Sequence, residues 1–269
     1  METIVDKYGV EYDIKQKILI KASPDLKEEY IVHPNTEIIH PFAFINCKKI
    51  ESIVLPDKLQ YIGTGSFLGC SALKRIDIPD SVLQISSNTF SGCRELESVS
   101  LPQNLITIGG YAFCHCEHLH EVIIPQTVSA IKEHAFYFCL NLQKVYFQGT
   151  LRRLPHGVFS HCENLNRLDL PYNIEIINER AFEYCKSLEQ ITIPSTVRLI
   201  DTKAFKDCSR LEQVNIVSLN TYIRWDVFDG CIFKYIFYLR ITMNSKNILN
   251  ILTYILMAHN SNITIFYIS

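Results

Sequence analysis

Apolar residues recur along most of the chain with a period of 23 residues. In nine copies a Phe stands three residues before a Cys, and both columns keep the same register throughout. The nine pairs are Phe44/Cys47, Phe67/Cys70, Phe90/Cys93, Phe113/Cys116, Phe136/Cys139, Phe159/Cys162, Phe182/Cys185, Phe205/Cys208 and Phe228/Cys231. A fixed period of this length predicts a solenoid of stacked structural units.

The positions between these columns give the plan of one unit, C-x-x-L-x-x-I-x-I-P-x-x-V-x-x-I-x-x-x-A-F-x-x. The I-x-I alternation has the period of a strand with one buried face, and the Pro that follows ends the strand because it has no N–H to donate. The A-F-x-x-C stretch predicts a helical or 3₁₀ turn. Short polar residues eleven positions after the Cys, such as Thr127 and Thr196, are expected to pair backbone groups in the bend.

This motif resembles the BspA-like leucine-rich repeats, also called the TpLRR type, whose units have this length and an A-F-x-x-C signature. The resemblance implies a curved leucine-rich-repeat solenoid, with a parallel β-sheet on one face and turns or short helical segments on the other. It also implies an interaction module, often found on cell surfaces. No catalytic residues are known to accompany the motif.

Three segments follow from the pattern. Residues 1–27 resemble the N-terminal hairpin cap that leads into such repeats, and residues 28–231 hold about nine units. Residues 232–269 lose the pattern, since Lys234 stands where Leu is expected and no Pro follows. We expect this tail to be an atypical cap, or sequence read beyond a disrupted reading frame. The fifth unit also departs from the plan, with F-Q-G at 147–149 in place of I-P-x.

Composition and charge narrow the possible partners. Hydrophobic residues make up 48% of the chain and charged residues 20%, which is typical of a globular protein. A net charge of −2 lacks the electrostatic footprint of a nucleic-acid binder. The charged start METIVDKYGVEYD does not match a signal peptide, and the apolar run at 248–258 is too short to span a bilayer. As written, the chain is expected to be a cytoplasmic monomer without membrane insertion, whereas the family resemblance implies the cell surface if the native gene is exported.

The stretch YAFCHCEHLH has the composition of a metal site. Cys116, however, belongs to the repeated Cys column and needs no local explanation. The remaining potential ligands are Cys114, His115, His118 and His120. They fall on positions that vary between units, which we interpret as surface positions. Zinc requires four convergent ligands, so we predict no metal and no cofactor. Metal binding through the Cys114–His120 stretch remains the less favoured alternative.

The nine column cysteines are expected to be reduced and buried. An odd number of equivalent thiols offers no unique pairing, although the spacing of stacked units alone does not exclude disulfides. A buried thiol of this kind behaves as a small hydrophobic group.

The sequence contains no phosphate-binding loop, nucleophile elbow or H-E-x-x-H helix, so we predict no enzyme. Function is expected on the outward strand positions, five and seven residues after each Cys. At the centre of that face these are Ile123, Lys144, Tyr146, Arg167 and Asp169. An apolar and aromatic centre beside an Arg and a polar rim is typical of protein interfaces.

The sequence therefore predicts a non-catalytic module that binds a protein of unknown identity. By family resemblance it is a surface antigen or adhesin, and an intracellular scaffold is the alternative. It also remains open that the five residues are tolerated solvent-facing positions without a partner.

Overall fold

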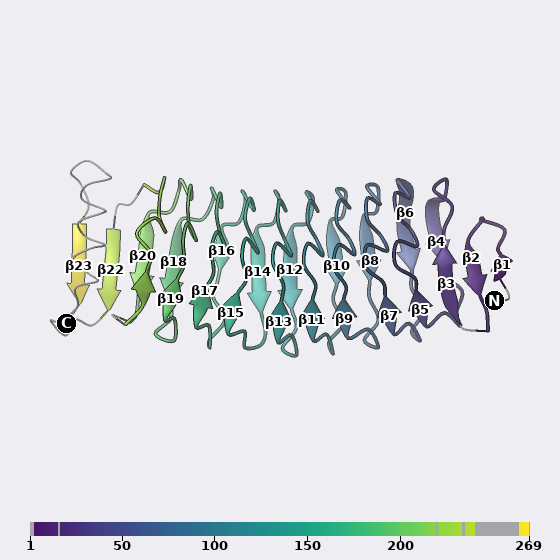
Figure 1. Cartoon of the computed structure of the whole chain (residues 1–269). Helices are drawn as coiled ribbons and strands as arrows, with labels where there is room; N and C mark the ends of the chain where they lie inside the picture. Colours follow the sequence, from purple (N-terminus) through teal and green to yellow (C-terminus); the bar gives the residue numbers. More distant parts are fainter. Residues whose placement is uncertain (1–2, 16, 219, 233–234, 240–263, 269) are drawn as a thin grey trace.

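The computed structural model describes residues 3–15, 17–218, 220–232, 235–239 and 264–268. The repeats wind into turns that lie side by side along one axis, with the two termini at opposite ends of the stack (Figure 1). Most units contribute two strands, one from the I-x-I positions and a short one from positions fourteen and fifteen after the Cys. The predicted solenoid with parallel strands is confirmed.

Strands from the I-x-I positions, with β22 and β23 beyond the last repeat, build one side of the stack, which we call the long-strand face. They are β4 (Lys27–Ile31), β6 (Lys49–Val54), β8 (Arg75–Asp77), β10 (Ser98–Ser100), β12 (Glu121–Ile124), β14 (Lys144–Phe147), β16 (Arg167–Leu168), β18 (Gln190–Ile193), β20 (Gln213–Ile216), β22 (Tyr235–Leu239) and β23 (Thr264–Ile268). They pair in parallel within three sheets, β4-β6-β8-β10, β12-β14-β16 and β18-β20-β22-β23. Equivalent residues of neighbouring units face each other, as Val122 and Val145 do.

A second sheet system, the short-strand face, was not predicted. It contains β1 (Thr3–Val5), β2 (Glu11–Asp13), β3 (Ile18–Lys21), β5 (Ile38–Ile39), β7 (Tyr61–Ile62), β9 (Gln84–Ile85), β11 (Thr107–Ile108), β13 (Ala130–Ile131), β15 (Arg153–Leu154), β17 (Ile176–Ile177), β19 (Leu199–Ile200) and β21 (Tyr222–Ile223). From β5 onward each of these strands has two residues, with the second one buried. Two residues are too few to show the alternation by which a strand is recognised in a sequence.

The A-F-x-x-C stretch forms turns, so the prediction of a helical or 3₁₀ segment there is wrong. None of the described residues lies in a helix, and hence none of these segments is a helix able to cross a membrane. The cause is a left-handed backbone conformation at two positions, five residues and one residue before the Cys. The residues with positive φ at these positions are Phe42, Gly65, Asn88, Tyr111, His134, Gly157, Arg180 and Lys203, and Asn46, Gly69, Gly92, His115, Phe138, His161, Tyr184, Asp207 and Gly230. A left-handed residue interrupts a right-handed helix.

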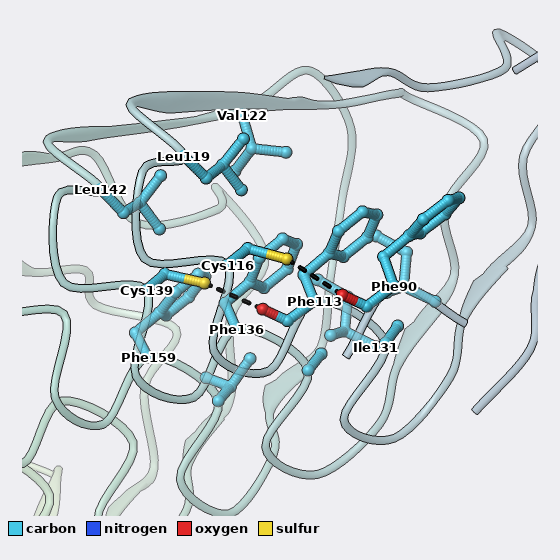
Figure 2. Packing of buried hydrophobic residues seen from close by; sticks show 14 of the residues in the cluster. Phe90, Phe113, Cys116, Leu119, Val122, Ile131, Phe136, Cys139, Leu142 and Phe159 are labelled. Carbon is cyan, nitrogen blue, oxygen red and sulfur yellow. Dashed lines mark hydrogen bonds between the residues drawn. The ribbon is translucent and has the colours of Figure 1, made fainter. Parts of the chain in front are cut away.

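The Phe column forms a continuous stack of rings inside the solenoid. Neighbouring rings lie nearly parallel, with centroids 5.0–5.7 Å apart. Figure 2 shows the middle of this stack, where Phe113 and Phe136 are fully buried among Leu119, Val122 and Leu142. Each ring contacts the rings of the next units, and the core is therefore shared along the stack.

The Cys column has a role that the sequence analysis missed. Each of the nine thiols donates a hydrogen bond to a backbone carbonyl of the preceding turn, at 3.0–3.4 Å. From Cys70 onward the acceptor is the carbonyl of the preceding unit's Phe, and Figure 2 shows this for Cys116 and Cys139. The thiol thus joins neighbouring turns in addition to filling space.

The bend after the Pro is closed as predicted in several units. The Oγ1 of Thr127 donates to the carbonyl oxygens of Gln103 and Leu105, at 2.8 and 2.7 Å. Thr196 and Ser81 make equivalent pairs of hydrogen bonds with the preceding unit. The expected role of this polar column is confirmed.

At the N-terminal end, β1, β2 and β3 pair antiparallel before β3 joins β5 in parallel. The hydroxyl of Tyr30 contacts that of Tyr12 and lies 2.7 Å from Asp6 Oδ2, and the ring of Tyr30 packs beside Phe44. At the other end β22 pairs with β20, and β23 with β22. Most of the predicted 232–269 tail lies outside the described residues, so its nature as a cap stays a prediction.

Candidate functional site

All five residues predicted for binding lie on or beside the central sheet of the long-strand face. Lys144 on β14 stands in register with Arg167 on β16, and Ile123 on β12 stands in register with Tyr146 on β14. Asp169 follows directly after β16. The side chains of Ile123 and Tyr146 are 46% and 40% exposed, Arg167 and Asp169 are exposed, and Lys144 is half-buried. The structure brings the five residues together as a patch, and their role in binding stays a prediction.

Among the described residues, the charged side chains of this patch form no close ion pair of the kind found elsewhere on the face, although Lys144 stands in register with Glu121 of β12. In the R-x-D sequence of β8, Arg75 Nη2 lies 3.1 Å from Asp77 Oδ2. The same R-x-D sequence recurs at Arg167 and Asp169, yet among the described residues neither of these two forms a salt bridge. Lys144 stands in register with Glu121 of β12 on one side and with Arg167 of β16 on the other. The second pair consists of like charges on neighbouring strands, an arrangement that is unfavourable in a sheet.

The sheet is interrupted beside this patch. Between other neighbouring units, a backbone hydrogen bond joins the residues four positions after the Cys: the N–H of the later unit donates to the carbonyl of the preceding one. Asn166 donates in this way to Gln143 at 3.2 Å, and Glu212 donates to Glu189 at 2.9 Å. In the described structure, the step from Asn166 to Glu189 lacks this bond, and β16 and β18 belong to different sheets. One backbone carbonyl and one N–H are therefore free to bind a ligand or water.

Two adjoining grooves of about 590 and 560 Å³ follow the interruption. They share Asp169, Leu170 and Pro194 as lining residues. The first groove is lined by polar side chains such as Asn166, Arg167, Gln190 and Thr192 together with apolar residues such as Leu168 and Ile191. Aromatic rings line the second, with Tyr146, Phe147 and Tyr172. Sequence reasoning missed the grooves and Tyr172, since no motif in the sixth unit indicates that its strand is short.

The F-Q-G departure in the fifth unit lies at the second groove. The ring of Phe147 replaces the usual Ile and meets the ring of Phe159 edge to face, with centroids 6.4 Å apart. Gly149 passes so close to the preceding unit that a Cβ there would lie 2.3 Å from the carbonyl oxygen of Gln126. This departure was the only sequence signal of an irregular surface near the patch.

The structure separates the residues of the CHCEHLH stretch. The thiol of Cys116 points into the core toward the Phe90 carbonyl, and His118 Nδ1 lies 3.0 Å from Glu95 Oε2. The ring of His115 stacks on Phe138, whereas His120 is exposed just before β12. In the described ranges, no group of three or more His, Cys, Asp or Glu side chains is arranged to hold a metal ion.

Cys114 corrects one expectation, because it was interpreted as a surface position and is only 6% exposed. The turn directs its side chain inward, between Ser91 of the preceding unit and Tyr137 of the next. Burial raises the pKa of the Cys114 thiol to about 11. The thiol is therefore protonated and poorly nucleophilic at neutral pH.

A ladder of half-buried rings runs along the turns and was also missed. His115, Phe138, His161 and Tyr184 stack with centroids 4.1–4.9 Å apart. All four occupy the left-handed position before the Cys. A comparison of the residues directly before the Cys in all units, instead of His115 alone, would have indicated a repeated structural role.

Comparison with known proteins agrees with this geometry. The family model described as BspA type leucine rich repeat region matches residues 37–166 and 139–250, in six copies. Among solved structures, a leucine-rich repeat protein from Bacteroides ovatus is 29% identical, with a TM-score of 0.69, over 87% of this chain and 68% of that chain. A leucine-rich repeat protein from Eubacterium ventriosum is 22% identical, with a TM-score of 0.61, over 81% and 68% of the two chains.

A leucine rich cell surface protein from Faecalibacterium prausnitzii is also similar, at 22% identity and a TM-score of 0.47, over 84% of this chain and 76% of that chain. A search of curated proteins found no match. The family model covers well over half of the sequence, and the residues that it matches include the stacked Phe and Cys columns. The chain belongs to the BspA type leucine-rich repeat family.

Proposed function

We propose that the chain is a non-catalytic protein-binding module that holds its partner on the long-strand face, at the grooves beside β16. The observation that carries this proposal is the pair of exposed apolar side chains, Ile123 and Tyr146, in register beside Lys144 and Arg167, which form no salt bridge among the described residues. Leucine-rich repeat proteins commonly serve as interaction modules. An aromatic anchor next to an Arg is also the usual composition of an interface hot spot.

The chemistry of the thiols supports a non-catalytic role. A catalytic Cys needs a lowered pKa, because the thiolate is the nucleophile. Burial instead raises the pKa of Cys47 to about 11, and raises that of Cys70, Cys116 and Cys139 well above the usual range.

The setting proposed for this module is a surface antigen or adhesin. An intracellular scaffold is a second candidate, favoured by one observation: all ten cysteines are free and buried. Free thiols are the normal state in a reducing compartment. Alkylation and mass spectrometry of protein from its native cells separates the two, because disulfide-linked cysteines would indicate export and ten free thiols would favour the scaffold.

The binding proposal is tested with a partner captured in those cells by a photo-crosslinking amino acid at position 146. Purified partner is then titrated against Tyr146→Ala and Arg167→Ala. Each variant is expected to raise the Kd about tenfold or more, as truncation of an interface anchor does. Tyr61→Ala is the matched control, because Tyr61 is 42% exposed on the short-strand face. Equal Kd values for wild type and all three variants would refute the proposal.

A further inference from the structure

We propose that the long-strand face beside β16 recognises an extended acidic segment of the partner. The carboxylate of this segment lies between Lys144 and Arg167, next to the groove that Arg167 lines, and its neighbouring apolar side chain packs on Tyr146 in the second groove. This inference rests on the proposed function and specifies the chemistry of the partner.

The carboxylate is inferred from the charge order along the long-strand face. The residues five positions after each Cys are, in order, Ser52, Arg75, Ser98, Glu121, Lys144, Arg167, Gln190 and Gln213. Only Lys144 and Arg167 are like charges in neighbouring units of this column, and their strands place them in direct register. A carboxylate between them replaces the repulsion by two charge-assisted hydrogen bonds, and a guanidinium can bind it through two parallel N–H groups.

An extended main chain is inferred from the interruption of the sheet. The carbonyl of Asn166 and the N–H of Glu189 are without the bond that joins equivalent groups at neighbouring steps. They offer one acceptor and one donor, to which an extended main chain that crosses the face can bind with its own N–H and C=O groups. The two units stay joined through their turns, since Ser187 N–H donates to Glu163 O at 2.9 Å. The segment therefore lies across the face and does not insert as a new strand.

The lining residues give the segment a direction. Asp169 lies where the two grooves meet, so it repels a second carboxylate there and accepts a hydrogen bond from a ligand N–H. Beyond it the rings of Tyr146 and Tyr172 form an apolar surface, and Tyr172 is 82% exposed. An acidic residue beside an apolar one fits this order of groups.

The experiment uses the full chain and three immobilised peptide pools of about nine residues, a length that spans both grooves at ~3.3 Å per residue. The central residue is Glu in one pool, Gln in the second and Lys in the third, and it is followed by Tyr in all three. All other positions are random. The Glu pool is expected to retain about tenfold more protein than the Gln pool. Raising NaCl from about 0.05 M to about 0.5 M should reduce this preference, because salt screens exposed charges.

The double variant Lys144→Gln/Arg167→Gln should lose the preference for Glu. Its melting temperature should change little, because the substitutions remove both the repulsion between Lys144 and Arg167 and the attraction of Lys144 to Glu121 on β12. Arg75→Gln, on the same face but paired with Asp77, should keep the preference.

Equal retention of the three pools, a preference for Lys, or no retention of any pool would overturn the inference. If the preference for Glu is absent and Tyr146→Ser still weakens retention, the acidic partner is refuted and the proposed function stands. If Tyr146→Ser also has no effect, both fail.

Discussion

The Sγ–H of Cys116 donates a hydrogen bond to the carbonyl oxygen of Phe90, 3.2 Å away and 26 residues earlier in the chain. The same bond recurs along the stack, so each buried thiol adds a second donor to a backbone acceptor that lies inside the core. The Phe90 carbonyl also accepts the N–H of Cys93 at 3.1 Å, and a carbonyl oxygen has two lone pairs with which it can accept both bonds. This relationship gives a physical reason for Cys, rather than Ala, in the repeat.

Replacement of Cys116 tests this role. Cys116→Ala removes the thiol's hydrogen bond to the Phe90 carbonyl, which keeps the N–H of Cys93 as a donor at 3.1 Å, and leaves a small void. The variant should lower the free energy of unfolding by about 1–2 kcal/mol. Cys116→Ser keeps a donor and should be less destabilising than Ala. Urea unfolding measures both. If Ser proves more destabilising than Ala, the thiol acts mainly as an apolar group.

The Phe column should dominate stability in the middle of the stack. Phe136→Ala removes a fully buried ring that stacks on both neighbours, and should cost about 3–5 kcal/mol in unfolding free energy. The matched control is Leu83→Ala, whose side chain is 48% exposed. If Phe136→Ala and Leu83→Ala lower the melting temperature by the same small amount, the result would contradict the observed packing.

The columns of the repeat predicted which residues are buried, because burial follows from period and side-chain type alone. Phe136, Cys116 and Ile131 all lie in the core as expected. The five patch residues were also placed on one face, since strand alternation determines which side chains point outward.

Other features depend on backbone geometry and could not be derived in this way. The left-handed turn positions hold residues as different as Phe42, Gly65 and Arg180, so side-chain type hides the shared conformation. The recurrence of Gly and Asn there, as at Gly92 and Asn88, was the available signal. The gap between β16 and β18 is set by strand length and has no residue signature.

Two glycines should respond differently to a methyl group. Gly92 has φ +75° and its Cβ would meet only ordinary contacts, so Gly92→Ala reports backbone strain and should cost about 1–2 kcal/mol. In Gly149→Ala the Cβ would clash with the Gln126 backbone, so this variant should destabilise more and also weaken binding at the neighbouring groove. Unfolding curves and partner titrations measure these effects. Equal stability losses would show that the contact with Gln126 is not rigid.

Two half-buried histidines should make stability depend on pH. Burial lowers the pKa of His134 below its usual 6.5, assisted by His156 and Arg180 and opposed by Glu133. Burial likewise lowers the pKa of His161, assisted by Lys186 and His115 and opposed by Glu163. The fold favours the neutral rings, so their contribution to stability is complete above pH 6.5 and is lost as pH falls through the lowered pKa.

The double variant His134→Asn/His161→Asn removes both titrations and keeps the turns, because Asn88 and Asn46 occupy equivalent left-handed positions. The melting temperature of the wild type should fall more steeply than that of the variant between pH 6.5 and about 5. Replacement of the exposed His120 by Asn is the control. Parallel pH profiles for the wild type and the double variant would contradict the assigned role.

Hydrogen–deuterium exchange of the full chain with and without its captured partner tests the central claim most directly. We predict slower exchange in the complex at β12, β14 and β16 and at the N–H of Glu189, with the short-strand face unchanged. Slower exchange only on the short-strand face, with exchange on the long-strand face unchanged, would contradict the assignment of the binding site.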